Sequence, residues 1–188
     1  MVVGDFSREV DVLVVGGGPG GYVAAIRAAQ LGKKVTLVEK DALGGVCLNR
    51  GCIPSKALIT VAEWYERMRH ADGMGISVQG VQLHMDKVQQ WKNKIVQQLT
   101  DGVQALLKGH QVEIIKGEAY FTSPHEVRVV SGYENERLNF HHCIIATGSR
   151  PVELRAFPVD EQHILSSTGA LNLEKIPERL LVIGGGYI

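Results

Sequence analysis

The strongest constraint on this chain is a glycine cluster that directly follows an apolar run. Residues 12–15 read Val-Leu-Val-Val, which predicts a β-strand buried on both faces, and residues 16–21 read Gly-Gly-Gly-Pro-Gly-Gly. An alanine-rich stretch at 22–31 then predicts a helix, and 35–38 predict a second buried strand that ends at Glu39. This order predicts a β-α-β unit and therefore an α/β fold.

The spacing of these glycines is that of a dinucleotide-binding turn. Gly16 permits the tight turn, Gly18 lets the backbone approach a pyrophosphate, and Gly21 lets the helix pack closely on the strand. The helix N-terminus offers N–H groups to the phosphates, and Glu39 would accept hydrogen bonds from ribose hydroxyls. The alternative is an ordinary glycine loop, and the pattern alone does not distinguish NAD from FAD.

Two cysteines five positions apart, Cys47 and Cys52, allow three interpretations: a redox pair, half a zinc site or two core thiols. A structural zinc ion takes four ligands. The third cysteine, Cys143, has the neighbour His142, which points to the opposite face of a predicted strand, so a zinc site is disfavoured. The polar, glycine-containing segment between Cys47 and Cys52 is unlike a core and favours a redox pair.

Cys52 lies just before Pro54, where a helix is expected to begin and to run to about His70. Thiolates are favoured at helix N-termini. If the helix begins this early, Lys56 shares a face with Cys52 and could stabilise electron density on a nearby cofactor. A solvated surface lysine is the alternative for Lys56.

The rest of the chain predicts a longer helix, a hairpin and a second, similar unit. An apolar stripe predicts the helix, and it consists of Val88, Trp91, Ile95, Leu99, Val103 and Leu106. Residues 112–120 predict a strand, 127–140 a hairpin around Ser131-Gly132, and 143–146 a buried strand. Residues 180–186 repeat the opening pattern of apolar strand and glycines. We therefore expect one domain at 1–150, and a linker and the first strand of a second domain at 151–188.

Composition excludes several classes of function. The chain has 20 Lys and Arg against 20 Asp and Glu, so a strongly basic nucleic-acid surface is not expected. No apolar run reaches the ~18 residues of a membrane span, and no signal peptide is evident. We therefore expect a cytoplasmic protein that binds neither nucleic acid nor membrane. None of the seven histidines is assigned a role.

The segment 44–56, Gly-Gly-Val-Cys-Leu-Asn-Arg-Gly-Cys-Ile-Pro-Ser-Lys, resembles the redox-disulfide motif of the pyridine nucleotide–disulfide oxidoreductases. Residues 146–151 resemble the second flavin-contacting motif of that family, 117–119 resemble its adenine-contacting strand, and 165–171 also fit. The similarity covers essentially the whole chain. Arg50 is a departure, because the family often has Val there, and we attach no function to it.

The resemblance implies a Rossmann-like FAD-binding domain with a parallel sheet and a β-hairpin or meander insertion, followed by the start of a Rossmann-like NAD domain. Cys47 and Cys52 would form the redox-active disulfide, with Cys52 against the flavin, Cys47 exchanging with substrate and Lys56 near the flavin N5. Gly184 and Gly186 would begin the NAD site. The positions implied to contact FAD are Gly16, Gly18, Pro19, Gly20, Gly21, Glu39, Lys40, Gly45, Val46, Cys47, Cys52, Lys56, Gly117, Ala119, Ala146, Thr147, Gly148 and Ser149.

The Leu-Asn and Ile-Pro-Ser-Lys variant is most similar to the branch of the family that oxidises dihydrolipoamide. That branch implies a lipoyl-bearing protein substrate, a 2-oxo acid dehydrogenase complex and a homodimer. Branches that reduce mercuric ion or glutathione tend to carry Val in place of the Leu and Ile, and they remain alternatives, as does a fragment that only binds a nucleotide. Family members are more than twice this length, so we expect the 188 residues alone to hold FAD weakly and to lack turnover.

Overall fold

The computed structural model describes residues 7–152 and 154–186, and these separate into two compact units. The first comprises Met1–Cys47 and Leu99–Ser149, and the second comprises Leu48–Gln98 and Arg150–Ile188. The division into domains at residue 150 remains a prediction.

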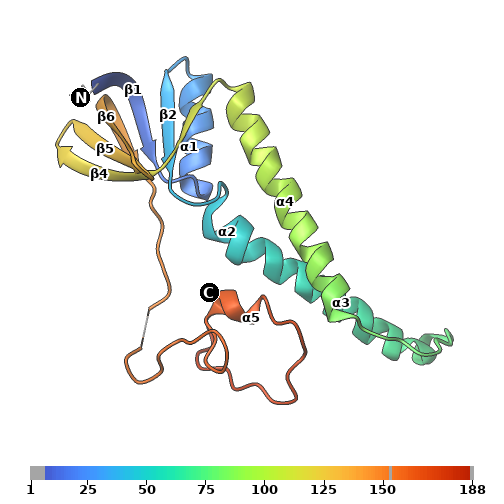
Figure 1. Ribbon diagram of the computed structural model, residues 1–188. Helices are drawn as coiled ribbons and strands as arrows, with labels where there is room; N and C mark the ends of the chain where they lie inside the picture. The colour runs from blue at the N-terminus through green and yellow to red at the C-terminus, as the bar shows by residue number, and fades with distance from the viewer. Residues whose placement is uncertain (1–6, 153, 187–188) are drawn as a thin grey trace. The chain divides into compact units, whose positions relative to one another are not determined.

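The first unit is built on a six-stranded mixed sheet in the order β3-β2-β1-β6-β5-β4 (Figure 1). The pairs β1–β2, β1–β6 and β2–β3 are parallel, whereas β4–β5 and β5–β6 are antiparallel. This confirms the predicted Rossmann-like parallel sheet with a meander insertion. The strands are β1 (Ser7–Val15), β2 (Val35–Glu39), β3 (Glu113–Lys116), β4 (Glu118–Ser123), β5 (Glu126–Ser131) and β6 (Glu134–Ile145).

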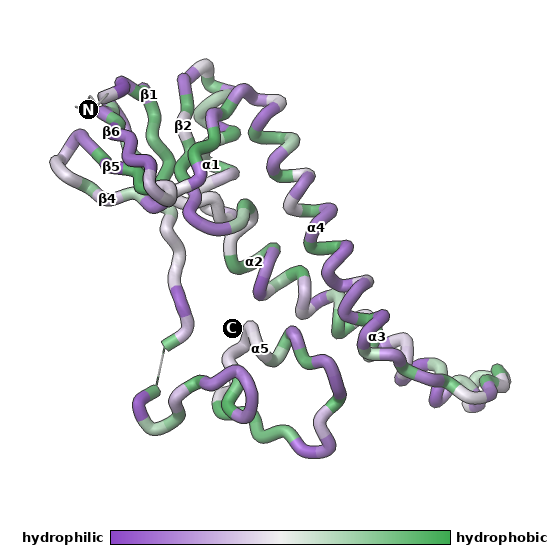
Figure 2. The backbone as a smooth tube through the Cα atoms, viewed as in Figure 1, coloured by the Kyte–Doolittle hydropathy of each residue, from purple (hydrophilic) through white to green (hydrophobic). Residues whose placement is uncertain are grey.

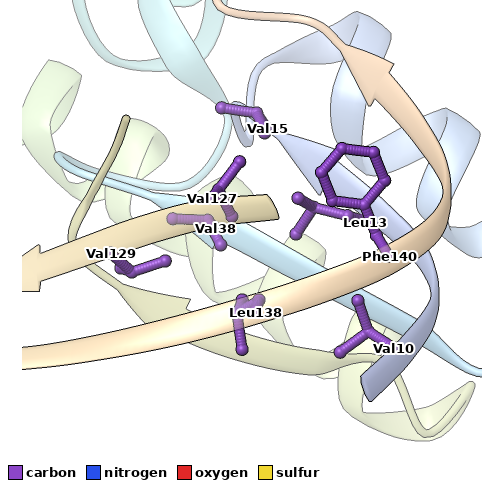
Figure 3. Close-up of a cluster of buried hydrophobic side chains, with 8 residues drawn as sticks. All are labelled: Val10, Leu13, Val15, Val38, Val127, Val129, Leu138 and Phe140. Atoms are coloured by element: carbon purple, nitrogen blue, oxygen red, sulfur yellow. The ribbon is translucent and has the colours of Figure 1, made fainter. Parts of the chain in front are cut away.

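Apolar side chains from four strands form the core of this unit (Figure 3). The carboxyl half of β1 is continuously apolar, as Figure 2 shows, because both faces of the sheet are covered here, with Leu13 and Val14 fully buried. The helix α1 (Pro19–Gln30) packs on β1 and β2 through its alanine-rich face, with Ala25 fully buried. The cluster comprises Val10, Leu13, Val15, Val38, Val127, Val129, Leu138 and Phe140.

Helix α3 (Cys52–Arg69) and the first half of α4 (Met85–Gly109) lie in the second unit. A short 3-10 helix, η1 (Ala71–Met74), follows α3. The short helix α5 (Ser167–Ala170) belongs to the second chain segment of this unit, Arg150–Ile188. The expected helix from Pro54 is thus confirmed and begins at Cys52. Within residues 7–152 and 154–186, no helix has both the length and the apolar character needed to cross a membrane.

The buried side of α4 differs from the predicted stripe. Of the predicted stripe, Val103 is buried as expected, whereas Trp91 is 43% exposed and Leu106 is 54% exposed. Lys92 and Leu107, which lie outside the stripe, are buried. Lys92 is only 2% exposed and donates hydrogen bonds to the Leu171 carbonyl (2.9 Å) and to Asn172 Oδ1 (2.7 Å). Burial lowers the pKa of Lys92. The spacing of apolar residues in α4 could not predict the burial of Lys92, because this burial depends on hydrogen bonds to a turn that is distant in the sequence.

Three local predictions need correction. The single strand expected at 112–120 is divided at Gly117, whose N–H donates to the Glu39 carbonyl (3.0 Å) between β3 and β4. The segment 44–55, whose glycines and proline predict turns, contains a helix, α2 (Gly45–Arg50). Residues 180–183, the expected first strand of a second domain, form no strand and are exposed. A strand requires a paired neighbour, and within the described ranges no segment pairs with these residues.

The end of β6 is less buried than its apolar sequence indicates. Ile144 and Ile145 are 37% and 65% exposed. The pairing explains this exposure, because β5 follows β6 only as far as Asn139 whereas β1 continues to Ile145. The last residues of β6 therefore have a neighbouring strand on one side only.

Cys143 nevertheless packs against the core cluster, and burial raises the pKa of its thiol. Since the thiolate is the reactive form, we expect Cys143 to react slowly with iodoacetamide at neutral pH in the native protein. Mass mapping after timed alkylation checks this, with the denatured protein as the control for intrinsic reactivity. Labelling of native Cys143 as fast as the reduced Cys47 and Cys52 would contradict its assignment as an inert core thiol.

Candidate nucleotide and redox site

The glycine turn lies at the carboxyl end of the parallel strands, where α/β sheets bind ligands. Its backbone is fixed by hydrogen bonds from the Gly16 N–H to the Val38 carbonyl and from the Ala146 N–H to the Val15 carbonyl, both 2.8 Å. Gly18 is the N-cap of α1 and has no side chain to accept from the first-turn N–H groups. The first turn also carries no acidic residue. These backbone donors can therefore face a bound anion.

The glycines of the turn divide into those that the fold requires and those that it does not. A Cβ on Gly21 would fall on the Gly16 carbonyl, and one on Gly16, where φ is +104°, would fall on the Ala146 carbonyl. By contrast, a Cβ on Gly18 would meet only Gly45 Cα, at an ordinary 3.8 Å. Packing within the protein thus explains Gly16 and Gly21 but not Gly18. The reason that the sequence predicted for Gly18, close approach of a ligand to its backbone, stays a prediction.

Glu39 organises the turn through both carboxylate oxygens. Its Oε2 accepts from the Gly17 N–H (2.6 Å) and its Oε1 from the Asp41 N–H (2.7 Å). An ionised carboxylate has about four acceptor positions, so ribose hydroxyls can still bind. The sequence indicated the ribose role but not these two internal bonds.

The segment that carries the cysteines begins in contact with this turn. Gly45, with φ of +58°, lies so close to Gly18 that a Cβ on it would be 2.7 Å from Gly18 Cα. The Gly44 N–H also donates to the Gly17 carbonyl (2.8 Å). Val46 and the half-buried Cys47 follow in α2. The structure therefore brings Cys47 and the glycine turn together within the first unit.

Cys52 and Lys56 belong to the second unit. Cys52 is the first residue of α3 and is exposed, with Gly51 as the N-cap. Lys56, also exposed, is four residues further along the same helix, so the two side chains share a face, as expected. The pairing of Cys47 with Cys52 in a disulfide stays a prediction.

The predicted adenine-contacting segment, residues 117–119, lies beside the end of β2. The bond from the Gly117 N–H to Glu39 places Glu118 and Ala119 beside that strand end. Lys40 Nζ donates to Glu118 Oε1 (2.9 Å), and the Tyr120 hydroxyl donates to Glu118 Oε2 (2.8 Å). The sequence did not indicate this network, because residues 40 and 118 are too distant in the chain to suggest a pair.

The remaining predicted contacts lie in two places. Ala146 adjoins the turn, since its Cβ would be 3.8 Å from a Cβ on Gly20, and Thr147, Gly148 and Ser149 follow it as exposed backbone beyond β6. Gly184, with φ of +115°, and Gly186 lie in the second unit, and added Cβ atoms there would contact nothing within 4 Å. The NAD-binding role of Gly184 and Gly186 therefore stays a prediction.

The model of the pyridine nucleotide-disulphide oxidoreductase family matches residues 10–188. The chain belongs to this family. It is 60% identical to dihydrolipoyl dehydrogenase from Geobacillus stearothermophilus and 58% identical to that from Bacillus subtilis, in each case over the whole chain and 40% of the relative. The chain thus spans about 40% of the length of the curated relatives that it matches.

Solved structures of the family share the fold. LpdA from Mycobacterium tuberculosis superposes with a TM-score of 0.81 at 24% identity, over 90% of this chain and 38% of that chain. The HOCl-induced flavoprotein disulfide reductase RclA from Escherichia coli gives 0.72 at 27% identity, over 89% and 35% respectively. The likeness to LpdA supports the architecture alone.

Proposed function

We propose that these residues form the FAD site and the redox disulfide of an NAD-dependent dihydrolipoyl dehydrogenase. The proposal rests mainly on the contact between Gly45 and Gly18, because the cysteine-bearing segment begins at this contact with the glycine turn. A redox pair needs an electron carrier within reach, and this contact places Cys47 in the same unit as the nucleotide cradle. The names of the relatives at 58–60% identity support the choice of substrate.

The residues of the turn fit the dinucleotide part of FAD. The uncapped first turn of α1 would bind the pyrophosphate, and the lack of a side chain at Gly18 allows its approach. Glu39 would accept the ribose hydroxyls, and the backbone of residues 117–119 would border the adenine. We further propose that Ala146 to Ser149 border the flavin half and that Lys56 lies near the flavin N5.

The proposed reaction is a thiol–disulfide exchange. A thiolate of dihydrolipoamide attacks Cys47 and releases the Cys52 thiolate, and the second substrate thiol then displaces Cys47 to give lipoamide. The substrate loses two electrons and two protons, and the Cys47–Cys52 pair holds the electrons as a dithiol. Bound FAD would supply the chemistry that takes this electron pair and delivers it to NAD as hydride.

The wider setting is proposed from the resemblance of the sequence to the branch of the family that oxidises dihydrolipoamide. Gly184 and Gly186 would begin the NAD site, the lipoyl-bearing protein would belong to a 2-oxo acid dehydrogenase complex, and the enzyme would be a cytoplasmic homodimer. A panel of dihydrolipoamide, glutathione disulfide and mercuric ion, assayed in a chain that spans the length of the relatives, tests the substrate. Turnover of either alternative but not of dihydrolipoamide would overturn the substrate assignment.

The Gly18→Ala substitution tests the cradle. The N-cap conformation of Gly18 (φ −72°, ψ −176°) suits alanine, and the added Cβ has room in the protein, so we expect normal folding. Against a pyrophosphate the same methyl group should cost about 1–3 kcal/mol, which weakens FAD binding roughly ten- to a hundredfold. FAD titration of the flavin-free protein, followed by fluorescence, measures the loss.

Gly102→Ala is the matched control. Gly102 lies within α4, and a Cβ there would contact nothing within 4 Å. The Gly102→Ala protein should bind FAD with the same affinity as the unsubstituted protein. Unchanged FAD affinity in Gly18→Ala would contradict the assignment of this turn to the pyrophosphate.

A further inference from the structure

Beside the proposed ribose site, one cation is held by a neighbouring carboxylate. Lys40 directly follows Glu39, and its Nζ lies 2.9 Å from Glu118 Oε1. The other oxygen of Glu118 accepts from the Tyr120 hydroxyl (2.8 Å). Lys40, Glu118 and Tyr120 thus form a three-residue network, which we call the ribose-side network.

The electrostatic effects within this network are mutual. The hydrogen bond to Glu118 raises the pKa of Lys40, and the Glu39 charge raises it further. The bonds from Lys40 and Tyr120 lower the pKa of Glu118, and the bond to Glu118 raises the pKa of Tyr120. The charge of Glu39 therefore attracts the Lys40 ammonium group, but the hydrogen bond of Lys40 goes to Glu118.

This arrangement bears on which ribose the site accepts. In dinucleotide-binding folds, an acidic residue at the end of the second strand binds a free ribose diol, whereas a nearby cation accommodates a 2′-phosphate. Here both residue types are adjacent, so Glu39 and Lys40 alone would leave the choice open. Glu118 engages the cation and adds a second negative charge, which disfavours a phosphate monoester.

We propose that Glu118 is a specificity-determining residue that keeps the adenosine site selective for an unphosphorylated ribose by holding Lys40. Tyr120 positions Glu118 through its second oxygen. The proposal rests on the proposed nucleotide site and names which ribose that site rejects. The excluded ligands are adenine nucleotides that carry a phosphate on the ribose, such as NADP.

The test compares ADP with its 2′-phosphate derivative by calorimetry on the flavin-free protein. In Glu118→Gln, the ion pair with Lys40 becomes at most a neutral hydrogen bond and one negative charge is lost, so the affinity ratio should shift about three- to tenfold toward the phosphorylated ligand. Since these side chains are exposed, the shift should shrink when salt is raised. Adding Lys40→Met to Glu118→Gln should reverse it.

Glu134→Gln is the control for net charge, because Glu134 is an exposed carboxylate at the β5–β6 turn, where its partner in the ladder is Ser131. It should shift the ratio less than twofold. An equal shift in Glu118→Gln and Glu134→Gln would overturn the specificity role of Glu118, and so would a shift that persists when Lys40→Met is added. If ADP still binds in either case, the nucleotide site itself is retained. If the unsubstituted protein binds neither ligand, both the site and this inference fail.

Discussion

Replacement of either Cys47 or Cys52 by Ser is expected to lower dihydrolipoamide oxidation by about a thousandfold or more, in a chain that spans the length of the relatives. The reason is that a serine hydroxyl can neither exchange with a disulfide nor hold the electron pair of the substrate. Initial rates of NAD reduction measure the loss. A thousandfold is far beyond the effect expected from a stability change alone at these half-buried and exposed positions.

The two variants should differ in their spectra. With FAD bound, reduced Cys47→Ser should keep the long-wavelength absorbance of a thiolate against flavin, and Cys52→Ser should lose it, because we assign the flavin contact to Cys52. Cys143→Ala is the matched control and should retain both turnover and absorbance, since Cys143 is partly buried and packs against the core cluster of the sheet. The opposite spectra would exchange the two roles, and wild-type turnover in either variant would remove the disulfide from the mechanism.

The parts of the fold that the sequence predicted well are those set by local rules. The run 12–15, the glycine turn and Glu39 follow the period and turn chemistry of a β-α-β unit, and the structure places them accordingly. The tight turn at Gly16 and the close packing of helix on strand at Gly21 were also predictable, because the spacing fixes where helix and strand meet.

Predictions that depended on distant neighbours were less successful. Ile145 is as apolar as a core residue, but it is exposed because β5 ends short of it in the sheet. Lys92 is polar yet buried, because it caps the turn at Leu171 and Asn172. The pairing of Lys40 with Glu118 likewise depends on β2 and β4 meeting at Gly117. None of these follows from a window of neighbouring residues.

Gly21→Ala is expected to destabilise the protein by about 3 kcal/mol or more, a much larger effect than the same substitution at Gly18. The added Cβ would collide with the Gly16 carbonyl oxygen and lie 2.8 Å from the carbonyl carbon. Both atoms are backbone, so relief requires α1 to move away from β1. That movement would disturb the bond from the Gly16 N–H to Val38 as well.

Chemical denaturation of the flavin-free protein measures this effect without a contribution from ligand binding. Gly102→Ala again serves as the control and should leave stability unchanged or raise it by up to about 1 kcal/mol, because alanine favours the helical state. Together with Gly18→Ala, the pair separates the two uses of glycine in one turn. Gly21→Ala should lose stability even without FAD, whereas Gly18→Ala should lose FAD with its stability intact. A Gly21→Ala protein as stable as Gly18→Ala would show that helix and strand can separate at no cost, and the close packing of α1 on the turn would then not explain this glycine.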